Sequence, residues 1–163
     1  IPLVDALNID VTSIDDNFYQ KICKRHLNVV KNTVEASVKA GKHVEITYLI
    51  ITDVNDKDQE FHKLVDWIAS LDDRIPLHFS RYFPNYKLDY PTTPIKTLET
   101  AYEIAKQKLK YVYIGNTYIE GTSDTHCPEC GNLLVNRSGY FTRVTGIDSG
   151  KCSQCGTRAD FTL

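Results

Sequence analysis

Hydrophobic and polar residues follow two alternating patterns along most of the chain. Four segments have the composition of β-strands, and the first three of them alternate apolar and polar residues at every second position, which is typical of strands with one buried face. They comprise residues 4–11, 43–51, 75–83 and 111–116. Between them, apolar residues recur every three or four positions, which is typical of amphipathic helices. The order strand, helix, strand predicts right-handed βαβ units and a parallel sheet.

The first two predicted helices carry boundary signals. An apolar stripe over residues 27–38 is followed by Gly41, which predicts a glycine cap at the end of the first helix. Asp56 and Gln59 have the spacing of a capping box, and the apolar stripe after them runs to Leu71. We therefore expect the second helix to begin at this box.

The predicted strands have one apolar and one polar face. Parallel strands covered by helices on both sides usually form continuous apolar runs, so this alternation favours an arc of a barrel over a doubly wound sheet. The fold class expected is α/β, a partial (β/α) barrel of about four parallel strands with helices. The polar face comprises Asn8, Asp10, Glu45, Thr47, His78 and Ser80.

Burying these polar groups without partners would cost several kcal/mol. We therefore expect the polar face to line a wet cavity that holds a ligand. The alternatives are that the groups satisfy one another or simply face solvent. Ligands of parallel α/β folds gather at the carboxyl ends of the strands. The residues nearest that edge are Asp10, Thr12, Thr52, Ser80, Arg81 and Asn116.

An aromatic segment follows the third predicted strand. Residues 82–90 are rich in tyrosine, and we expect this loop to cover the cavity or to pack at its rim. Thr93 then stands before Pro94, which predicts a capping residue and a proline at the first position of a helix that runs to about Leu109.

Two C-x-x-C-G knuckles lie near the end of the chain. Their cysteines, spaced C-x2-C-x21-C-x2-C, are Cys127, Cys130, Cys152 and Cys155. This spacing is close to that of zinc ribbons and predicts a structural metal site, because four thiolates leave no position for water or substrate. Zinc is the expected ion, with iron in a rubredoxin-like site as the alternative. The segment between the knuckles alternates and turns at Ser138-Gly139, as a hairpin would.

The domains expected are a partial barrel over residues 1–121 and a small zinc-ribbon or rubredoxin-like module over residues 122–163. The fifth cysteine, Cys23, is expected to be a buried small hydrophobe rather than a nucleophile. His26, His43 and His62 show no ligand spacing and are expected at the surface or in packing contacts.

Composition narrows the classes of function. The 163 residues include 25% charged residues and carry a net charge of −2. A basic excess for neutralising phosphates is therefore lacking, so a nucleic-acid binder is disfavoured despite the four cations of the cysteine module. No apolar run approaches the roughly 20 residues of a transmembrane helix, and cysteines confined to knuckles favour a reducing cytoplasm. The chain contains no methionine, and we expect it to be part of a longer polypeptide or a processed product.

Several segments resemble one enzyme family in order along the chain. "DALNIDV", "HVEITYLIITDVND", "IPLHFSRYFPNYKL" and "LKYVYIGN", followed by "CPECG", are similar to the C-terminal half of the radical S-adenosylmethionine enzymes of the AmmeMemoRadiSam group, which is related to pyruvate formate-lyase activating enzyme. The resemblance implies a partial barrel, a four-iron, four-sulfur cluster and S-adenosylmethionine. It also implies hydrogen abstraction by a 5′-deoxyadenosyl radical, with a protein as a possible substrate.

The chain departs from that family in identifiable places. The cluster-binding C-x-x-x-C-x-x-C motif is absent, so this chain alone is not expected to be catalytic and needs an N-terminal half in cis or in trans. Asp10 matches the first residue of the family's Asp-x-Lys, whereas Thr12 replaces the lysine. The family's Pro-Gly after the second strand is also replaced, in "ITDVND". The candidate cofactor-binding residues are Asp10, Thr12, Thr47, His78 and Ser80.

Three functions follow from these observations. The first is the C-terminal portion of a radical S-adenosylmethionine enzyme of the activating-enzyme type, with a structural metal-binding tail. The second is a non-catalytic, ribbon-bearing module that binds a protein partner and retains only the fold. The third is a zinc-ribbon nucleic-acid binder that uses Arg137, Arg143, Lys151 and Arg158, which the near-neutral total charge disfavours.

Overall fold

The computed structural model describes residue 1 and residues 3–161. The chain divides into two compact units, Ile1–Thr117 and Tyr118–Leu163, whereas the sequence places the boundary after residue 121. Within the described residues, no helix is both long enough and apolar enough to span a membrane.

The first unit is built on a four-stranded parallel sheet. Its strands are β1 (Ala6–Asp10), β2 (His43–Ile50), β3 (Leu77–Arg81) and β4 (Val112–Gly115), hydrogen-bonded in the order β1-β2-β3-β4. Sequential order with parallel pairing means that each connection crosses over the same sheet through a helix. The α/β class with four parallel strands is thereby confirmed.

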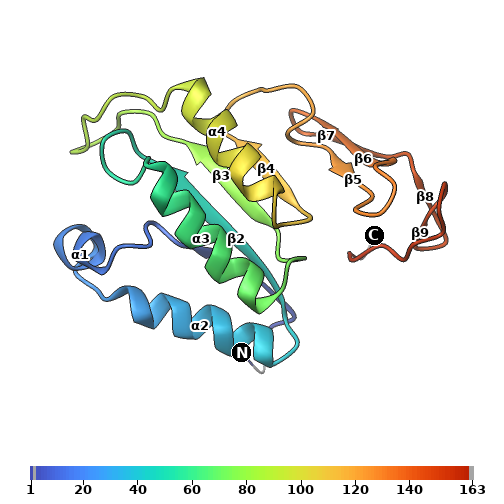
Figure 1. Ribbon diagram of the computed structural model, residues 1–163, viewed down its shortest axis with the longest axis horizontal. Coiled ribbons are helices and arrows are strands. Elements are labelled where there is room, and N and C mark those ends of the chain that lie inside the picture. Colours follow the sequence, from blue (N-terminus) through green and yellow to red (C-terminus); the bar gives the residue numbers. More distant parts are fainter. Residues whose placement is uncertain (2, 162–163) are drawn as a thin grey trace. The chain divides into compact units, whose positions relative to one another are not determined.

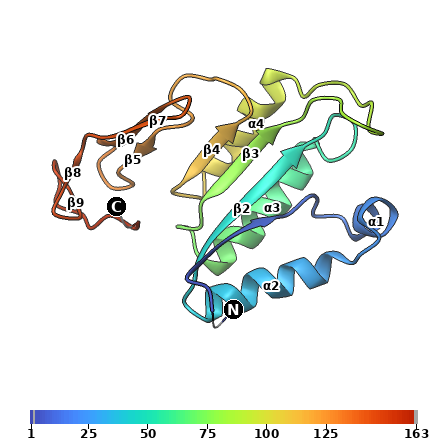
Figure 2. The same cartoon turned by 180° about the vertical axis from the view of Figure 1, so that it is seen from behind.

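The helices cover one face of this sheet. They are α1 (Asp16–Phe18), a π-helical turn η1 (Tyr19–Cys23), α2 (Leu27–Lys39), α3 (Asp58–Leu71) and α4 (Ile95–Lys106). In Figure 1 the three longer helices α2, α3 and α4 lie in front of the sheet, and in Figure 2 the same sheet lies in front of them. Among the described residues of this unit, no helix lies on the face seen in Figure 2.

The core lies between the sheet and these helices. Alternate residues of β2 are buried, and Tyr48 is fully enclosed, whereas the residues between them are half-buried or exposed. The rings of Tyr48, Phe61 and Phe79 meet edge to face, with centroids 5.9 to 6.3 Å apart. This geometry is favourable for aromatic quadrupoles, and it ties β2, β3 and α3 together. The polar residues of the strands are therefore left on the opposite face.

The predicted glycine cap is confirmed at the end of α2. Gly41 has a φ of 69°, and its N–H donates to the carbonyl of Val38 at 2.9 Å. The N–H of Lys42 donates to the carbonyl of Ser37 at 3.1 Å, which completes a Schellman motif. A side chain at position 41 would be strained in this left-handed conformation.

Two predicted helix starts are wrong. α3 begins at Asp58 after Lys57 rather than at a capping box, and no side chain caps it. α4 begins after Pro94, and the buried Thr93 does not cap it. Instead, the Thr93 hydroxyl accepts a hydrogen bond from the Tyr82 N–H and donates one to a carbonyl of β2. Because the Thr93 hydroxyl is engaged by these backbone groups, it is not available to the start of α4.

The second unit is a small antiparallel module. β5 (Thr125–His126), β6 (Leu133–Ser138) and β7 (Phe141–Val144) form one sheet, and β8 (Ile147–Asp148) pairs with β9 (Lys151–Cys152). β6 and β7 form the expected hairpin, in which Ser138 pairs with Phe141. The core of the module is small: Leu134 and Val135 are buried together with Cys127 and Cys152. Two cysteines therefore supply part of the apolar interior.

Candidate functional sites: a four-cysteine metal centre and an open polar sheet face

The two cysteine knuckles have the same backbone structure. In the first, the N–H of Gly131 donates to the carbonyl of Cys127 at 2.9 Å, and the N–H of Cys127 donates to the carbonyl of Asn132 at 2.8 Å. In the second, Gly156 and Cys152 make the equivalent bonds, at 2.9 and 2.8 Å. Gly131 and Gly156 have φ values of 73° and 76°, so glycine is required at the turn that closes each knuckle.

The four sulfur atoms converge on one point. All of them lie within 4.8 Å of one another, and the Cys127–Cys155 and Cys130–Cys152 sulfur pairs are each 3.6 Å apart. Four sulfurs at about 2.3 Å from a tetrahedral metal ion would be about 3.8 Å apart. A disulfide would require only about 2.05 Å. The geometry therefore fits a tetrathiolate metal site, and all four cysteines are free.

Hydrogen bonds favour thiolates at this site. The backbone amides of Cys155 and Gln154, together with the Asn132 side chain, lower the pKa of Cys152 to about 6. Hydrogen bonding to Thr157 lowers the pKa of Cys155. Since a metal binds the deprotonated sulfur, donors aimed at the sulfurs prepare the site for a cation.

Cys130 shows that the four sulfurs compete for protons. The backbone amide of Asn132 lowers its pKa, but burial and hydrogen bonds to the neighbouring thiols outweigh that effect and raise the pKa to about 12. A cation at the centre would remove this competition, because it attracts all four sulfurs at once. Cys127 and Cys152 are buried, Cys130 is half-buried and Cys155 is exposed, so the centre lies at the edge of its module.

The second site is the sheet face that carries no helix. Asp10, Thr47, His78 and Tyr113 are register partners on successive strands and form one row across the sheet (Figure 2). The predicted polar face is therefore present, and it is open to solvent rather than enclosed: Asp10 is exposed, and Thr47 and His78 are half-buried. Ser80 lies on the same face, one step nearer the carboxyl edge, opposite Gly115 of β4.

Glu45 links two histidines on this face. Its two carboxylate oxygens lie 2.9 Å from Nε2 of His78 and 3.1 Å from Nε2 of His43. The hydrogen bond from His78 is the main reason that the pKa of Glu45 falls to about 2, and His43 lowers it further. His43 was expected only as a surface or packing residue, and no spacing in the sequence signals its approach to Glu45.

Two further contacts order the row. The Thr47 hydroxyl donates to Oδ1 of Asn8 at 2.9 Å. The His78 ring stacks on Tyr113 with centroids 5.0 Å apart and an interplanar angle of 22°. Several polar groups of this face therefore satisfy one another, as one of the sequence-based alternatives held. Glu45, Asn8 and Tyr113 serve as partners of the predicted site residues.

Asn55 organises the carboxyl edge of the sheet, and the sequence analysis missed it. It is fully buried, and its Oδ1 accepts from the N–H of Ile51 at 2.6 Å. Its Nδ2 donates to the carbonyls of Thr12 at 2.7 Å and of Leu49 at 2.9 Å. The N–H of Thr12 also donates to the Tyr19 hydroxyl oxygen at 2.9 Å. The backbone of Thr12 is thus held at the end of β1.

The remaining predicted edge residues differ in their surroundings. Nδ2 of Asn116 donates to the carbonyl of Arg81 at 3.2 Å, and Nε of Arg81 donates to the carbonyl of Thr93 at 2.9 Å. The hydroxyl oxygen of Thr52 is buried without a hydrogen-bond partner among the described residues. Asn116 has a φ of 58°, a left-handed conformation that asparagine tolerates better than most residues.

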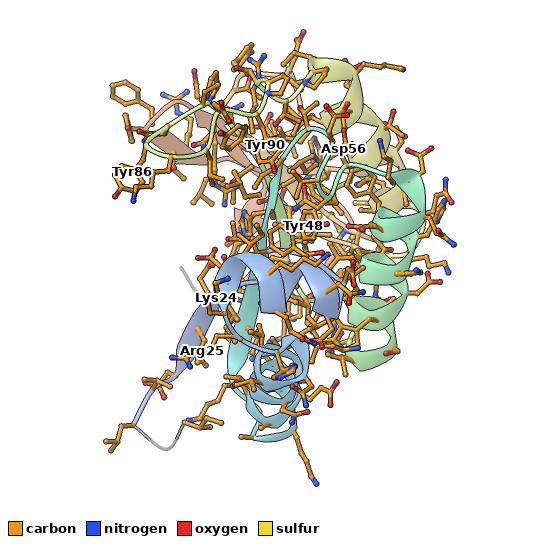
Figure 3. All side chains as sticks on the ribbon, turned by 90° about the vertical axis from the view of Figure 1, so that its left-hand side faces the viewer. Lys24, Arg25, Tyr48, Asp56, Tyr86 and Tyr90 are labelled. Carbon is orange, nitrogen blue, oxygen red and sulfur yellow. The ribbon has the colours of Figure 1, made fainter. Side chains whose placement is uncertain are left out.

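The loop after β3 extends away from the sheet. Tyr86 lies at its outer end and is exposed (Figure 3). The Tyr82 hydroxyl donates to the carbonyl of Leu88 at 2.7 Å and anchors the loop at its base.

Cys23 is half-buried at the end of η1 rather than fully buried. His26 lies 3.1 Å from a carboxylate oxygen of Asp16, in an exposed pair.

Comparisons with known proteins find a related sequence and a solved structure of similar fold. No family model matches the chain. An uncharacterized protein of Methanocaldococcus jannaschii is 41% identical over 165 residues, which cover 98% of this chain and 49% of that protein. The chain therefore spans about half the length of the curated relative that it matches.

A solved structure resembles part of the chain. The crystal structure of a domain of pyruvate-formate lyase-activating enzyme from Bacteroides vulgatus superposes with a TM-score of 0.59, covering 69% of this chain and 68% of that one. The two sequences are 20% identical over this match, so the likeness is one of fold. The chain thus shares its fold with an activating-enzyme domain and carries, near its end, four cysteines positioned to bind a metal.

Proposed function

We propose that this chain is the C-terminal part of a radical S-adenosylmethionine enzyme of the activating-enzyme type. The observation that carries the proposal is the open polar row on a parallel sheet whose fold is shared with an activating-enzyme domain. The relative in Methanocaldococcus jannaschii is about twice as long as this chain, which leaves room for a cluster-binding half.

Of the two cofactors that the proposal requires, the residues of this chain fit S-adenosylmethionine. Asp10, Thr47, His78 and Ser80 would contact S-adenosylmethionine on the open face, with Thr12 at its edge. When bound, the cluster and S-adenosylmethionine together supply a 5′-deoxyadenosyl radical for abstracting hydrogen from a protein or small-molecule substrate. Within the described residues, the four knuckle cysteines are the only grouped metal ligands, so the cluster would be bound by residues outside this chain, in cis or in trans.

We assign a structural role to the four-cysteine centre, with zinc as the proposed ion. A closed shell of four thiolates has no position for a substrate. Sulfur–sulfur distances of 3.6 Å suit zinc and iron equally, so the choice of zinc rests on its prevalence in such ribbons. A reducing, cytoplasmic location fits these free cysteines.

The enzyme proposal predicts cleavage of S-adenosylmethionine. A protein that contains this chain together with the cluster-binding half, reconstituted with iron and sulfide and then reduced, should produce 5′-deoxyadenosine, measurable by liquid chromatography. Asp10→Asn should lower the rate about tenfold or more, because a charge-assisted hydrogen bond is lost. The exposed Asp5, whose carboxylate lies 3.9 Å from Nζ of Lys42, provides the matched control Asp5→Asn, which should retain the wild-type rate. An absence of 5′-deoxyadenosine from the reduced, cluster-loaded protein would contradict the proposal.

A non-catalytic module that binds a protein partner is the second candidate. Tyr140 and Phe141 at the tip of the β6–β7 hairpin are largely exposed, which favours a contact surface. Thr12, in place of a lysine, also weakens the enzyme proposal. Failure of the reconstituted protein to cleave S-adenosylmethionine, combined with retained partner binding that Tyr140→Ala abolishes, would favour this candidate.

A further inference from the structure

The four cysteines of the metal centre differ in their access to solvent. Cys127 and Cys152 are each 3% exposed and belong to the small core of the module, and Cys130 is half-buried against that core. Cys155, in contrast, is exposed. A small solute would therefore meet Cys155 before it meets the other three.

The second knuckle fixes the position of the Cys155 sulfur. The N–H of Gly156 donates to the carbonyl of Cys152 at 2.9 Å, which closes the turn around Cys155. The hydroxyl oxygen of Thr157 lies 3.2 Å from the Cys155 sulfur. A backbone turn and one hydroxyl thus hold this sulfur, whereas Cys127 and Cys152 are held by apolar packing.

The exposed sulfur has a buried partner in the other knuckle. Sγ of Cys155 lies 3.6 Å from Sγ of Cys127, and Sγ of Cys130 lies 3.6 Å from Sγ of Cys152. A disulfide has a sulfur–sulfur distance of about 2.05 Å, so the first pair needs to close by only about 1.5 Å. The Cys127 sulfur is therefore within reach of any oxidised form of Cys155.

The metal keeps these cysteines in their reactive form. The thiolate is the form that binds a metal ion, and it is also the form that attacks peroxides. A peroxide reacts at sulfur, so it does not need an open position on the ion. In the metal-bound module, Cys155 is thus an exposed thiolate with a second thiolate beside it. This combination is typical of cysteines that undergo reversible oxidation.

We propose that Cys155 is a site of oxidation by hydroperoxides, that the product is a Cys127–Cys155 disulfide, and that the reaction releases the metal ion. The Cys155 thiolate attacks one oxygen of hydrogen peroxide, the O–O bond breaks, and Cys155 becomes a sulfenic acid as hydroxide leaves. The Cys127 thiolate then attacks the Cys155 sulfur, which forms the disulfide and expels a second hydroxide. The two sulfurs give up two electrons, and two protons from solvent convert the hydroxides to water.

The disulfide removes two of the four metal ligands. Cys130 and Cys152 remain, and two thiolates bind an ion less tightly than four. Because the module has little core apart from its metal site, oxidation should open it, and a thiol reductant should restore metal binding. This modification site depends on the four-cysteine centre alone and not on S-adenosylmethionine.

The first test maps the disulfide in the zinc-loaded protein. An equimolar amount of hydrogen peroxide is added, free thiols are alkylated, and trypsin digests the protein without reduction. Trypsin separates the two knuckles into the peptides 111–137 and 152–158. Mass spectrometry should find these peptides linked, with fragments that place the bond between Cys127 and Cys155. Zinc release, followed with a zinc-binding dye, should equal the amount of disulfide formed.

Cys23 is the internal control for this map. It lies in the other unit, outside the group of four sulfurs, and should stay reduced and become alkylated. A first product other than the Cys127–Cys155 disulfide would overturn the proposal, and so would the absence of any disulfide. Retention of zinc by the oxidised chains, or oxidation of Cys23 as fast as that of Cys155, would also contradict it.

The second test removes the reactive sulfur but keeps a zinc ligand. Cys155→His leaves three cysteines and one histidine, an ordinary structural zinc set, and should slow zinc release by peroxide about tenfold or more. Cys130→His is the matched control, because it makes the same exchange but preserves the Cys127–Cys155 pair, and it should release zinc at close to the wild-type rate. Equal rates for the two variants would overturn the proposal.

The disulfide map of the wild-type protein decides the question even where a variant fails to hold zinc. Neither test requires an iron–sulfur cluster or cleavage of S-adenosylmethionine. A failure of the enzyme proposal and a failure of this oxidation site are therefore separately visible.

Discussion

Asn55 shows how a single polar side chain stabilises the sheet edge. It is fully buried, and it supplies one acceptor and two donors to backbone groups at the ends of β1 and β2. Two of these bonds reach residues within its own loop and strand, whereas the bond to Thr12 spans 43 positions of the sequence. The amide thus connects two strands at the edge where the candidate site lies.

Replacing this amide should destabilise the first unit. Asn55→Ala leaves the N–H of Ile51 and the carbonyls of Thr12 and Leu49 without their partner, which should lower the free energy of unfolding by about 3 kcal/mol. Trp67 is the single tryptophan and lies on α3, so its fluorescence in urea reports this unit. Asn28→Ala on exposed α2 surface is the matched control and should change stability by less than about 0.5 kcal/mol. Equal stability of the two variants would contradict the role assigned to Asn55.

At the scale of elements, the segment that follows β7 in the metal module lies close against β6 at Gly146. This residue follows β7, and an added Cβ would overlap the carbonyl oxygen of Leu133 on β6. The Gly146 carbonyl also accepts from the N–H of Ser153, next to the second knuckle. Position 146, between the hairpin and the second knuckle, therefore has space only for glycine.

Gly146→Ala should loosen the module and its metal site. We expect a loss of about 1–3 kcal/mol from the overlap with backbone, observed as faster metal loss to a chelator. Gly139→Ala at the hairpin turn is the control: its φ of 58° is unfavourable for alanine, but no atom lies within 4 Å of the new Cβ. Its loss should be about 1 kcal/mol and should leave metal release almost unchanged. Release as fast from this control as from Gly146→Ala would show that the contact with Leu133 is unimportant.

At the scale of the whole molecule, the two units have separate interiors. The first has an aromatic and aliphatic core between sheet and helices, whereas the second relies on a few apolar residues and two buried cysteines. A module with so little core usually depends on its metal for folding.

Metal removal should therefore unfold one unit and spare the other. Elemental analysis should give about one metal ion per chain. Chelation should abolish the dispersed amide signals of residues 118–161, while the Trp67 transition in urea stays within about 0.5 kcal/mol of the metal-bound protein. Cys127→Ser should reproduce the effect of the chelator. A metal-free module with intact amide dispersion would contradict a metal-dependent fold, and a shifted Trp67 transition would show that the units stabilise each other.

The sequence by itself determined the α/β class, the two faces of the strands and the four-cysteine site. These features are local: alternation at every second residue reports which side of a strand is buried, and a two-residue knuckle brings two thiolates to one ion. Gly41 was also predictable, because a left-handed cap follows from the end of one apolar stripe.

Only the tertiary structure decided which polar groups meet. Glu45 and His78 are 33 positions apart, and their contact depends on the register of β2 against β3. Thr93 and Asp56 have the sequence signals of helix caps, but neither caps a helix, and the Thr93 hydroxyl bonds instead to the backbone of Tyr82 and of β2. Register and loop placement arise from long-range burial, which outweighs the roughly 1 kcal/mol of a local cap. The pattern of the chain therefore predicted a polar face, and the fold placed Asp10, Thr47 and His78 in one row on that face.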